Sequence, residues 1–161
     1  MLPQTLQTDM FKIKFKIQPR LNRGQNLKLR TRRRRNKKLE WYEAPDVKKL
    51  IDGLVKSLEF EHVSSERIFC FRTTGTKSRA IARIWSFPKI FQHALKIEPA
   101  YVIEVVSERF NKMGEREKTK VLIHELLHIP KNFSGSLLPH RYGNIRIDKE
   151  VERLFKKMSN Y

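Results

Sequence analysis

The chain has 161 residues, enough for one compact domain and too few for two. Hydrophobic residues make up 39% of it and charged residues 32%, so a core must lie beneath a highly charged surface. The net charge of +18 predicts attraction to polyanions such as nucleic acids. The single cysteine, Cys70, excludes an internal disulfide framework and a cysteine-rich zinc site. Because Cys70 lies in an apolar run, we expect a buried structural thiol.

No sign of a membrane segment or of a secretory signal is found in the sequence. No apolar stretch approaches the roughly 20 residues that span a bilayer. Near the N-terminus, residues 11–17 alternate between lysine and apolar side chains, whereas a secretory signal needs a continuous apolar run. We therefore expect a cytoplasmic protein with no membrane partner.

Residues 1–39 form a basic N-terminal extension. Between Phe11 and Lys38 there are thirteen Lys or Arg residues and no acidic residue. Such a block repels itself, which predicts disorder until an anion neutralises it. One interpretation is an arm that binds DNA or RNA without sequence preference. The others are a solvated tail, or extra coding sequence upstream of an alternative start at Met10.

Residues 40–161 have the composition of one folded domain. Apolar spacing predicts helices and β-branched or aromatic runs predict strands, while Pro88 and Pro130 mark ends. In chain order, the expected elements are a helix over 45–58, strands over 68–72 and 80–85, a short helix over 89–95, a strand over 101–106, and helices over 115–129 and 148–158. This order predicts an α+β domain, with a small sheet beside the long helix 115–129.

The long predicted helix contains the sequence His-Glu-Leu-Leu-His. His124 and His128 are four residues apart, so a helix places both imidazoles on one face, where they can share a tetrahedral Zn²⁺. Glu125 follows the first histidine and is our candidate catalytic base, because it can take a proton from a water that the zinc activates. Chance produces this pattern in roughly one chain of this length in a few hundred. The helical context favours a metal site over chance.

A catalytic zinc site needs a third protein ligand and an open fourth position. His140 is the leading candidate, because three of the five histidines fall within residues 124–140. Glu150, on the following predicted helix, is the alternative third ligand. Asp148 and Glu152, on the same predicted helix, are weaker candidates. The other two histidines, His62 and His93, are expected to be ordinary surface or half-buried residues.

Residues 120–130, with Phe133-Ser134-Gly135 and Pro139-His140, resemble small archaeal and phage metallopeptidases that are distantly akin to SprT-like zincins. Residues 72–85 and 101–104 resemble that family too, so the resemblance covers roughly 40–161. It implies a zincin fold, Zn²⁺ held by His124, His128 and His140, and Glu125 as the catalyst. A metzincin would carry a third histidine where this chain has Ser134, which excludes that subclass.

These observations predict a zinc-dependent metallopeptidase that hydrolyses peptide bonds in a protein or peptide substrate. In such enzymes the substrate commonly lies as an added strand along a sheet edge near the metal. Residues 80–85 are the candidate edge, with Trp85 either near the cleft or in the core. The alternative is a non-catalytic nucleic-acid-binding protein with a structural zinc site. The two also combine, as in SprT-like proteases that act on proteins at DNA.

Overall fold

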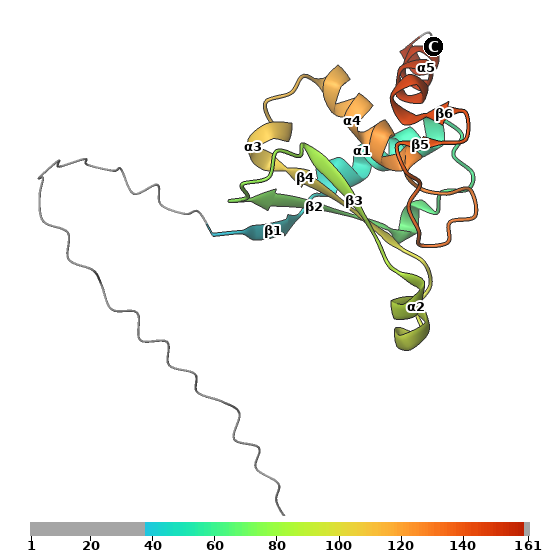
Figure 1. The fold of residues 1–161 in the computed structure, drawn as a ribbon. Helices are drawn as coiled ribbons and strands as arrows, with labels where there is room; N and C mark the ends of the chain where they lie inside the picture. The colour runs from blue at the N-terminus through green and yellow to red at the C-terminus, as the bar shows by residue number, and fades with distance from the viewer. Residues whose placement is uncertain (1–37, 160–161) are drawn as a thin grey trace, which may run out of the picture. The chain divides into compact units, whose positions relative to one another are not determined.

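The computed structural model describes residues 38–159, which form an α+β domain (Figure 1). The predicted N-terminal extension therefore falls almost wholly outside the described residues, and its disorder stays a prediction. Lys38 and Leu39 have no regular structure, and the first strand begins at Glu40. No helix within residues 38–159 is long and apolar enough to cross a membrane.

A four-stranded mixed sheet organises the domain. Its strands are β1 (Glu40–Glu43), β2 (Ile68–Thr74), β3 (Ala82–Ser86) and β4 (Tyr101–Val106). They lie in the order β1-β2-β4-β3, with β2 and β4 parallel and the two outer pairs antiparallel. β3 is therefore an edge strand, as the sequence predicts, although it covers 82–86 instead of 80–85.

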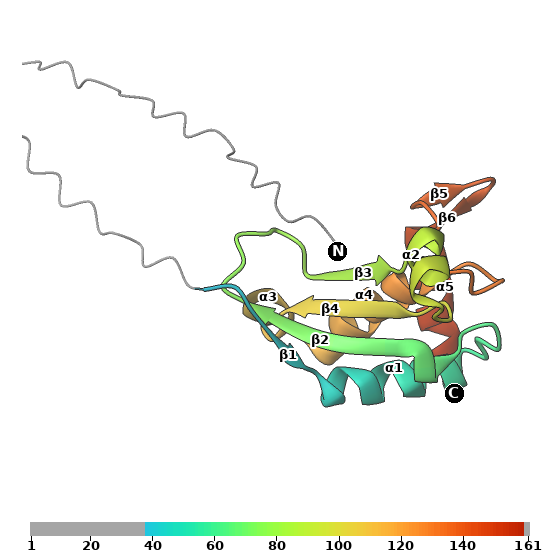
Figure 2. The same cartoon turned by 90° about the horizontal axis from the view of Figure 1, so that it is seen from below.

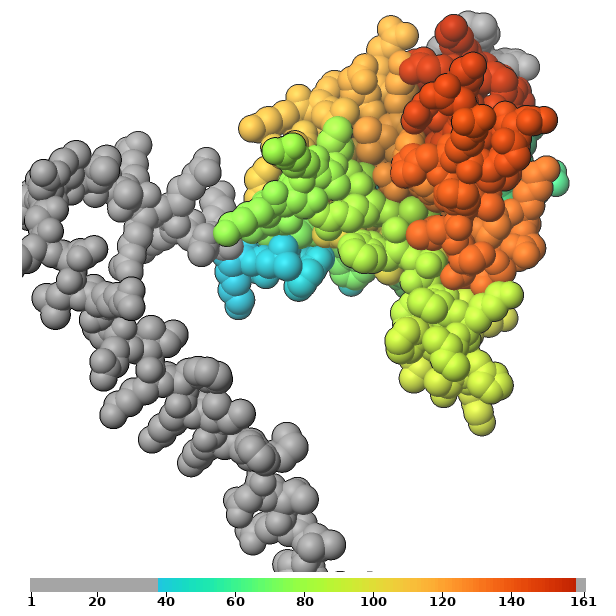
Figure 3. Space-filling view, in the orientation of Figure 1, coloured from blue at the N-terminus to red at the C-terminus, as the bar shows by residue number. Residues whose placement is uncertain are grey.

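The helices are α1 (Pro45–Ser57), α2 (Lys89–Leu95), α3 (Ser107–Phe110), α4 (Glu115–Leu127) and α5 (Ile147–Ser159). A 3-10 turn, η1, covers Ser65–Arg67, and a small hairpin pairs β5 (Arg141–Tyr142) with β6 (Ile145–Arg146). The sequence did not predict β1, η1, α3 or this hairpin. In the space-filling view the chain around α2 projects from the body of the domain (Figure 3).

The core lies between one face of the sheet and the helices α1, α4 and α5. Alternate residues of the central strands point into it, as in Ile68 and Cys70 of β2 and Ile103 and Val105 of β4. Cys70 is buried as expected, and burial raises the pKa of its thiol to about 12, so it stays protonated at neutral pH. Figure 2 shows the strands in front of α3 and α4, which cover the far face.

The helix α4 carries the His-Glu-Leu-Leu-His segment. Glu115 and Glu117 in its first turn complement the positive end of the helix dipole. The helix ends at Leu127, two residues earlier than predicted. The N–H groups of His128 and Ile129 bond three residues back, to the carbonyls of Glu125 and Leu126, which tightens the last turn before Pro130.

Candidate metal centre

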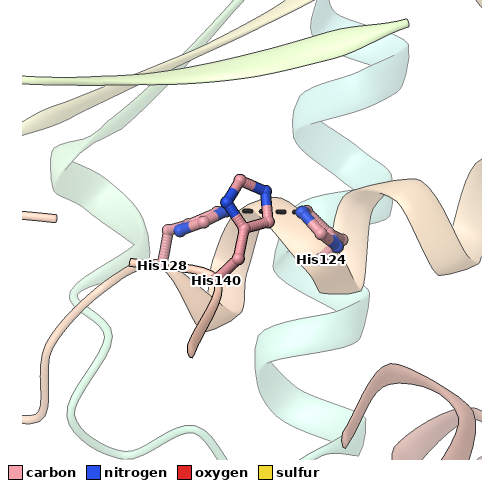
Figure 4. Close-up of side chains that lie close together, drawn as sticks. All are labelled: His124, His128 and His140. Atoms are coloured by element: carbon pink, nitrogen blue, oxygen red, sulfur yellow. Dashed lines mark hydrogen bonds between the residues drawn. The ribbon is translucent and has the colours of Figure 1, made fainter. Parts of the chain in front are cut away.

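Three imidazoles converge at the C-terminal end of α4. His124 and His128 project from one side of the helix, and His140 reaches them from the loop that follows it (Figure 4). One ring nitrogen of each lies within 4.8 Å of those of the other two. The structure therefore brings together the three histidines that the sequence singled out.

The spacing of two of these nitrogens fits a tetrahedral metal ion. The Nε2 atoms of His124 and His128 are 3.3 Å apart. Two ligands at about 2.0–2.1 Å from a tetrahedral zinc are separated by about 3.3–3.4 Å. Three histidine nitrogens would leave a fourth position free for a water or a substrate.

Leu138 fixes the orientation of His128 through two backbone contacts. The Nδ1 of His128 lies 2.6 Å from the carbonyl oxygen of Leu138, which accepts a hydrogen bond from it. The N–H of Leu138 in turn donates to the carbonyl of His128 at 2.8 Å. With the proton on Nδ1, the lone pair on Nε2 is left for a metal.

The ring of His124 has a carboxylate on its far side. Its Nδ1 lies 3.6 Å from Oδ1 of Asp148, the second residue of α5. Burial lowers the pKa of His124, the nearby His128 and His140 lower it further, and Asp148 opposes the shift. Burial also lowers the pKa of His128. Both rings therefore favour the neutral form, which is the form that binds metals.

Hydrogen bonds from side chains of β4 and α2 hold the loop that carries His140. The hydroxyl of Tyr101 donates to the carbonyl of Ser136 at 3.0 Å and accepts a hydrogen bond from the N–H of Gly135 at 2.9 Å. Gln92 donates to the carbonyl of Ser134 at 3.2 Å. Gly135 has φ of +75°, and a Cβ there would lie 2.7 Å from the carbonyl oxygen of Phe87. Only glycine fits this close approach.

Glu125 lies between the metal-binding face of α4 and the strand β3. Its residue is 8% exposed, and burial raises the pKa of its carboxyl to about 7, with a backbone hydrogen bond at Ile84 opposing the shift. Glu125 is therefore next to a ligand candidate, at the sheet edge, and poorly solvated. A carboxyl with these properties is a candidate for proton transfer at neutral pH.

Two adjoining depressions of about 340 Å³ each meet at His124 and Glu125. One includes the other two histidines and Ile84, and the second continues past Ala82 toward α5. Together they form a cleft along β3, open to solvent beside the three imidazoles. An extended chain lying along β3 would pass directly over the histidines.

Two of the alternative third ligands, Glu150 and Glu152, are paired with basic side chains. Glu150 pairs with Arg153, one turn along α5, and lines a different depression from the three histidines. Glu152 pairs with Lys120 at 2.8 Å. The structure therefore places His140, and not Glu150, beside the other two imidazoles. His62 is half-buried and His93 exposed, both outside the cluster, in agreement with the prediction.

The prediction for Trp85 was wrong in both of its forms. Its side chain is 52% exposed, so it is no core residue, and it lines a depression on the opposite face of the sheet from the helices. Side chains alternate along a strand, and Ile84 is the residue that points toward α4. Trp85 therefore points away from the imidazoles.

Sequence reasoning missed the contributions of Leu138 and Tyr101. Leu138 acts through its backbone N–H and carbonyl groups, which every residue except proline has, so its residue type does not predict this role. Tyr101 belongs to an apolar strand pattern, and nothing in that pattern shows that its hydroxyl contacts a loop more than thirty residues away.

Comparison with known proteins gives one match. The model of the family described as "Putative phage metallopeptidase" matches residues 39–159, which is most of the chain and all of the metal centre. No curated protein and no solved structure matches. The family name and the three-histidine cluster agree on a metallopeptidase that uses a metal ion. This chain belongs to the Putative phage metallopeptidase family.

Proposed function

We propose that the protein is a zinc-dependent endopeptidase with a zincin-like active site. His124, His128 and His140 hold the metal, and Glu125 is the catalytic residue. The observation that carries this proposal is the position of Glu125: a buried carboxyl beside three converging imidazoles, at the edge of an open cleft.

Zinc suits this donor set better than magnesium or calcium. Three imidazole ligands favour Zn²⁺ over Mg²⁺ or Ca²⁺, which prefer oxygen ligands. The separation of the two Nε2 atoms, 3.3 Å, suits tetrahedral coordination. A purely structural zinc site is normally closed by four protein ligands, whereas this one has three and opens into a cleft. The open position favours catalysis over a structural role.

The chemistry then follows from the residues around the cluster. A bound zinc ion would supply a Lewis acid that polarises the scissile carbonyl and makes water more acidic. Glu125 accepts the proton of the attacking water and returns it to the leaving amine. Its poor solvation raises its affinity for that proton. Leu138 holds His128 in one tautomer throughout.

The substrate is proposed to lie along β3. Within the described residues β3 has a partner strand on one side only, β4, so the backbone groups on its other side are free to pair with an extended peptide. Backbone pairing tolerates many side chains, so we expect a protein or peptide substrate and broad sequence tolerance. The depression beside Ala82 and Ile84 is also lined by the three histidines, which supports a scissile bond held at that point.

The substitution Glu125→Gln tests the proposal. It preserves shape and removes the proton acceptor, so kcat/KM should fall by about 10²–10⁴-fold while one zinc per chain is retained. Zinc content is measured by atomic emission, and activity by cleavage of unfolded casein. Glu117→Gln, an exposed residue of the same helix, is the matched control and should keep full activity.

Equal activity in Glu125→Gln and in the parent would remove Glu125 from the mechanism. A chain that binds zinc tightly, cleaves nothing and loses its fold on chelation would favour the structural alternative instead, because metal binding would then only stabilise the fold.

A further inference from the structure

A second depression adjoins the metal centre on the side of α5. It shares His124 and Glu125 with the depression that holds the three histidines, and its volume is about 340 Å³. We call it the side pocket. Beyond the two shared residues it has an aliphatic lining, Ile81, Ala82, Val121 and Val151, and a charged lining, Lys120, Asp148 and Glu152.

The aliphatic lining of the side pocket is only partly covered by the domain itself. Val151 is buried, whereas Val121 and Ile81 are partly buried and pack against the core. The N–H of Val106 donates to the carbonyl of Ile81 at 2.8 Å, which holds the chain in place just before β3. An apolar group that entered the side pocket would remove the rest of this aliphatic surface from water, which is favourable.

An ion pair joins α4 and α5 at the side pocket. The Nζ of Lys120 lies 2.8 and 3.0 Å from the two carboxylate oxygens of Glu152, and 5.1 Å from the centre of the Phe155 ring. Lys120 is one helical turn before His124, and Glu152 is one turn after Asp148, which contacts His124. The ion pair therefore crosses between the helices about 5.4 Å from the contact of His124 with Asp148. It bounds the side pocket on the side away from the histidines.

The charges of the side pocket favour an uncharged ligand. Lys120 and Glu152 neutralise each other, and Asp148, whose side chain is 74% exposed, already lies beside His124. A charged side chain that entered would lose hydration against the aliphatic lining. The separation of about one helical turn suits a side chain of the length of leucine and is too short for an indole.

We propose that the side pocket binds one aliphatic side chain of the substrate, next to the scissile bond, and that the ion pair of Lys120 with Glu152 limits the length of that side chain. A peptide that follows β3 passes the histidines beside Ile84 and reaches the side pocket beside Ala82 and Ile81. The inference rests on the proposed function, because it takes β3 as the line along which the substrate binds.

Peptide binding tests the inference without requiring cleavage. The ligands are blocked hexapeptides of alanine in which one residue is leucine, tryptophan or lysine. The protein is the zinc-loaded, full-length Glu125→Gln variant, which should bind these peptides and cut them far more slowly than the parent. By calorimetry, the leucine peptide should bind about 10–200-fold more tightly than the all-alanine peptide, and the tryptophan and lysine peptides should gain little. The parent should cleave the leucine peptide at a bond next to the leucine, which the product masses identify.

Removal of the ion pair should widen the choice of side chain. With Lys120→Ala and Glu152→Ala together, the tryptophan peptide should gain about 10-fold or more in affinity and approach the leucine peptide. Lys120→Glu with Glu152→Lys rebuilds the pair with reversed charges and should restore the preference for leucine, which a merely structural role of these residues would not predict. Glu115→Ala with Lys118→Ala removes an ion pair of the same helix outside the side pocket and should leave the preference unchanged. Zinc content and circular dichroism verify that each variant folds.

Three results would overturn the inference. One is equal affinity for the leucine and tryptophan peptides while the ion pair is intact. Another is a preference for the lysine peptide, since Asp148 and not the aliphatic lining would then select the substrate. The third is a preference for leucine over tryptophan that survives removal of the ion pair, because the pair would then not limit the length.

Failure of the proposed function gives a different pattern. A protein that binds the leucine peptide with the expected preference, but whose parent cleaves neither that peptide nor casein, keeps the side pocket and is no peptidase. A protein that cleaves casein and shows no preference among the peptides, or binds none of them, is a peptidase whose side pocket does not select the substrate. Absence of both binding and cleavage rejects both.

Discussion

The side chains of the metal centre are prepared for a cation before one binds. Burial is the main cause of the lowered pKa of His124 and His128, and it keeps both rings neutral. The contact of His128 with Leu138 then selects which nitrogen faces the cluster. Asp148, considered from sequence as a weak ligand candidate, lies instead behind His124, where it can orient that ring.

The third ligand can be tested at the level of single residues. His140→Ala should weaken zinc binding by more than the roughly 10–100-fold that loss of an outer partner costs, because it removes a coordinating atom. Glu150→Ala should leave zinc affinity nearly unchanged, since Glu150 pairs with Arg153 away from the cluster. The measurement is competition with a chromophoric chelator. Loss of zinc in Glu150→Ala and retention in His140→Ala would reverse our assignment.

At the scale of elements, the site is built from one helix, whose geometry is local, and one loop, whose path depends on contacts with distant residues. The helix α4 sets the spacing of His124 and His128 by itself, because residues four apart share a helical face. The loop of residues 129–140 has no regular structure, and it depends on Leu138, Tyr101 and Gly135 for its path.

This dependence predicts that Gly135→Ala damages the metal centre from a distance. Its φ of +75° alone costs a non-glycine residue about 1–2 kcal/mol, and the new Cβ would lie 2.7 Å from the Phe87 carbonyl oxygen. We expect a loss in unfolding free energy above about 2 kcal/mol and weaker zinc binding, because the loop carrying His140 must move. Urea denaturation and chelator competition measure the two effects.

Gly143 provides the matched control for that experiment. Its φ is also positive, at +54°, but a Cβ there would meet nothing within 4 Å. Gly143→Ala should therefore cost only the conformational part, about 1–2 kcal/mol, with unchanged zinc affinity. Equal effects of the two substitutions would mean that the close approach at Gly135 does not control the loop.

At the scale of the whole molecule, the dense run of basic residues and the candidate metal centre belong to different parts of the sequence. The family match covers residues 39–159, whereas the dense basic run lies before Leu39. In the described part, the cleft runs along β3 on the helix side, and the exposed tryptophans lie on the other side of the sheet.

The basic run makes a quantitative prediction about salt. Replacing Arg32, Arg33, Arg34 and Arg35 with alanine removes up to four phosphate contacts, so the slope of log affinity against log salt for oligo(dT) should become shallower by up to about 2.8. Anisotropy titrations across a range of salt concentrations measure it. Lys156→Ala with Lys157→Ala, exposed on α5, is the control and should leave the slope unchanged. Identical slopes for parent and quadruple variant would show that the run contacts no phosphate.

The sequence by itself determined the parts of the structure that local geometry controls. Helix periodicity placed α1, α4 and α5 to within two residues at either end, and the spacing of His124 and His128 followed from the helix. The order of the predicted helices and strands indicated the α+β class, and the apolar run around Cys70 predicted that its thiol is buried. Each of these depends on contacts between near neighbours, or on the hydrophobic effect acting on a whole apolar run.

Only the tertiary structure decided the rest. β1 is only four residues long, Glu-Trp-Tyr-Glu, which is too short a pattern to predict a strand, and its pairing with β2 defines it. Trp85 points to the face of the sheet opposite the helices because the strand begins at Ala82 and Ile84 is the residue that packs toward α4. His140, and not Glu150, joins the other imidazoles because Leu138 and Tyr101 fold the intervening loop back over α4. These outcomes rest on contacts between residues distant in sequence, whose energies no local pattern contains.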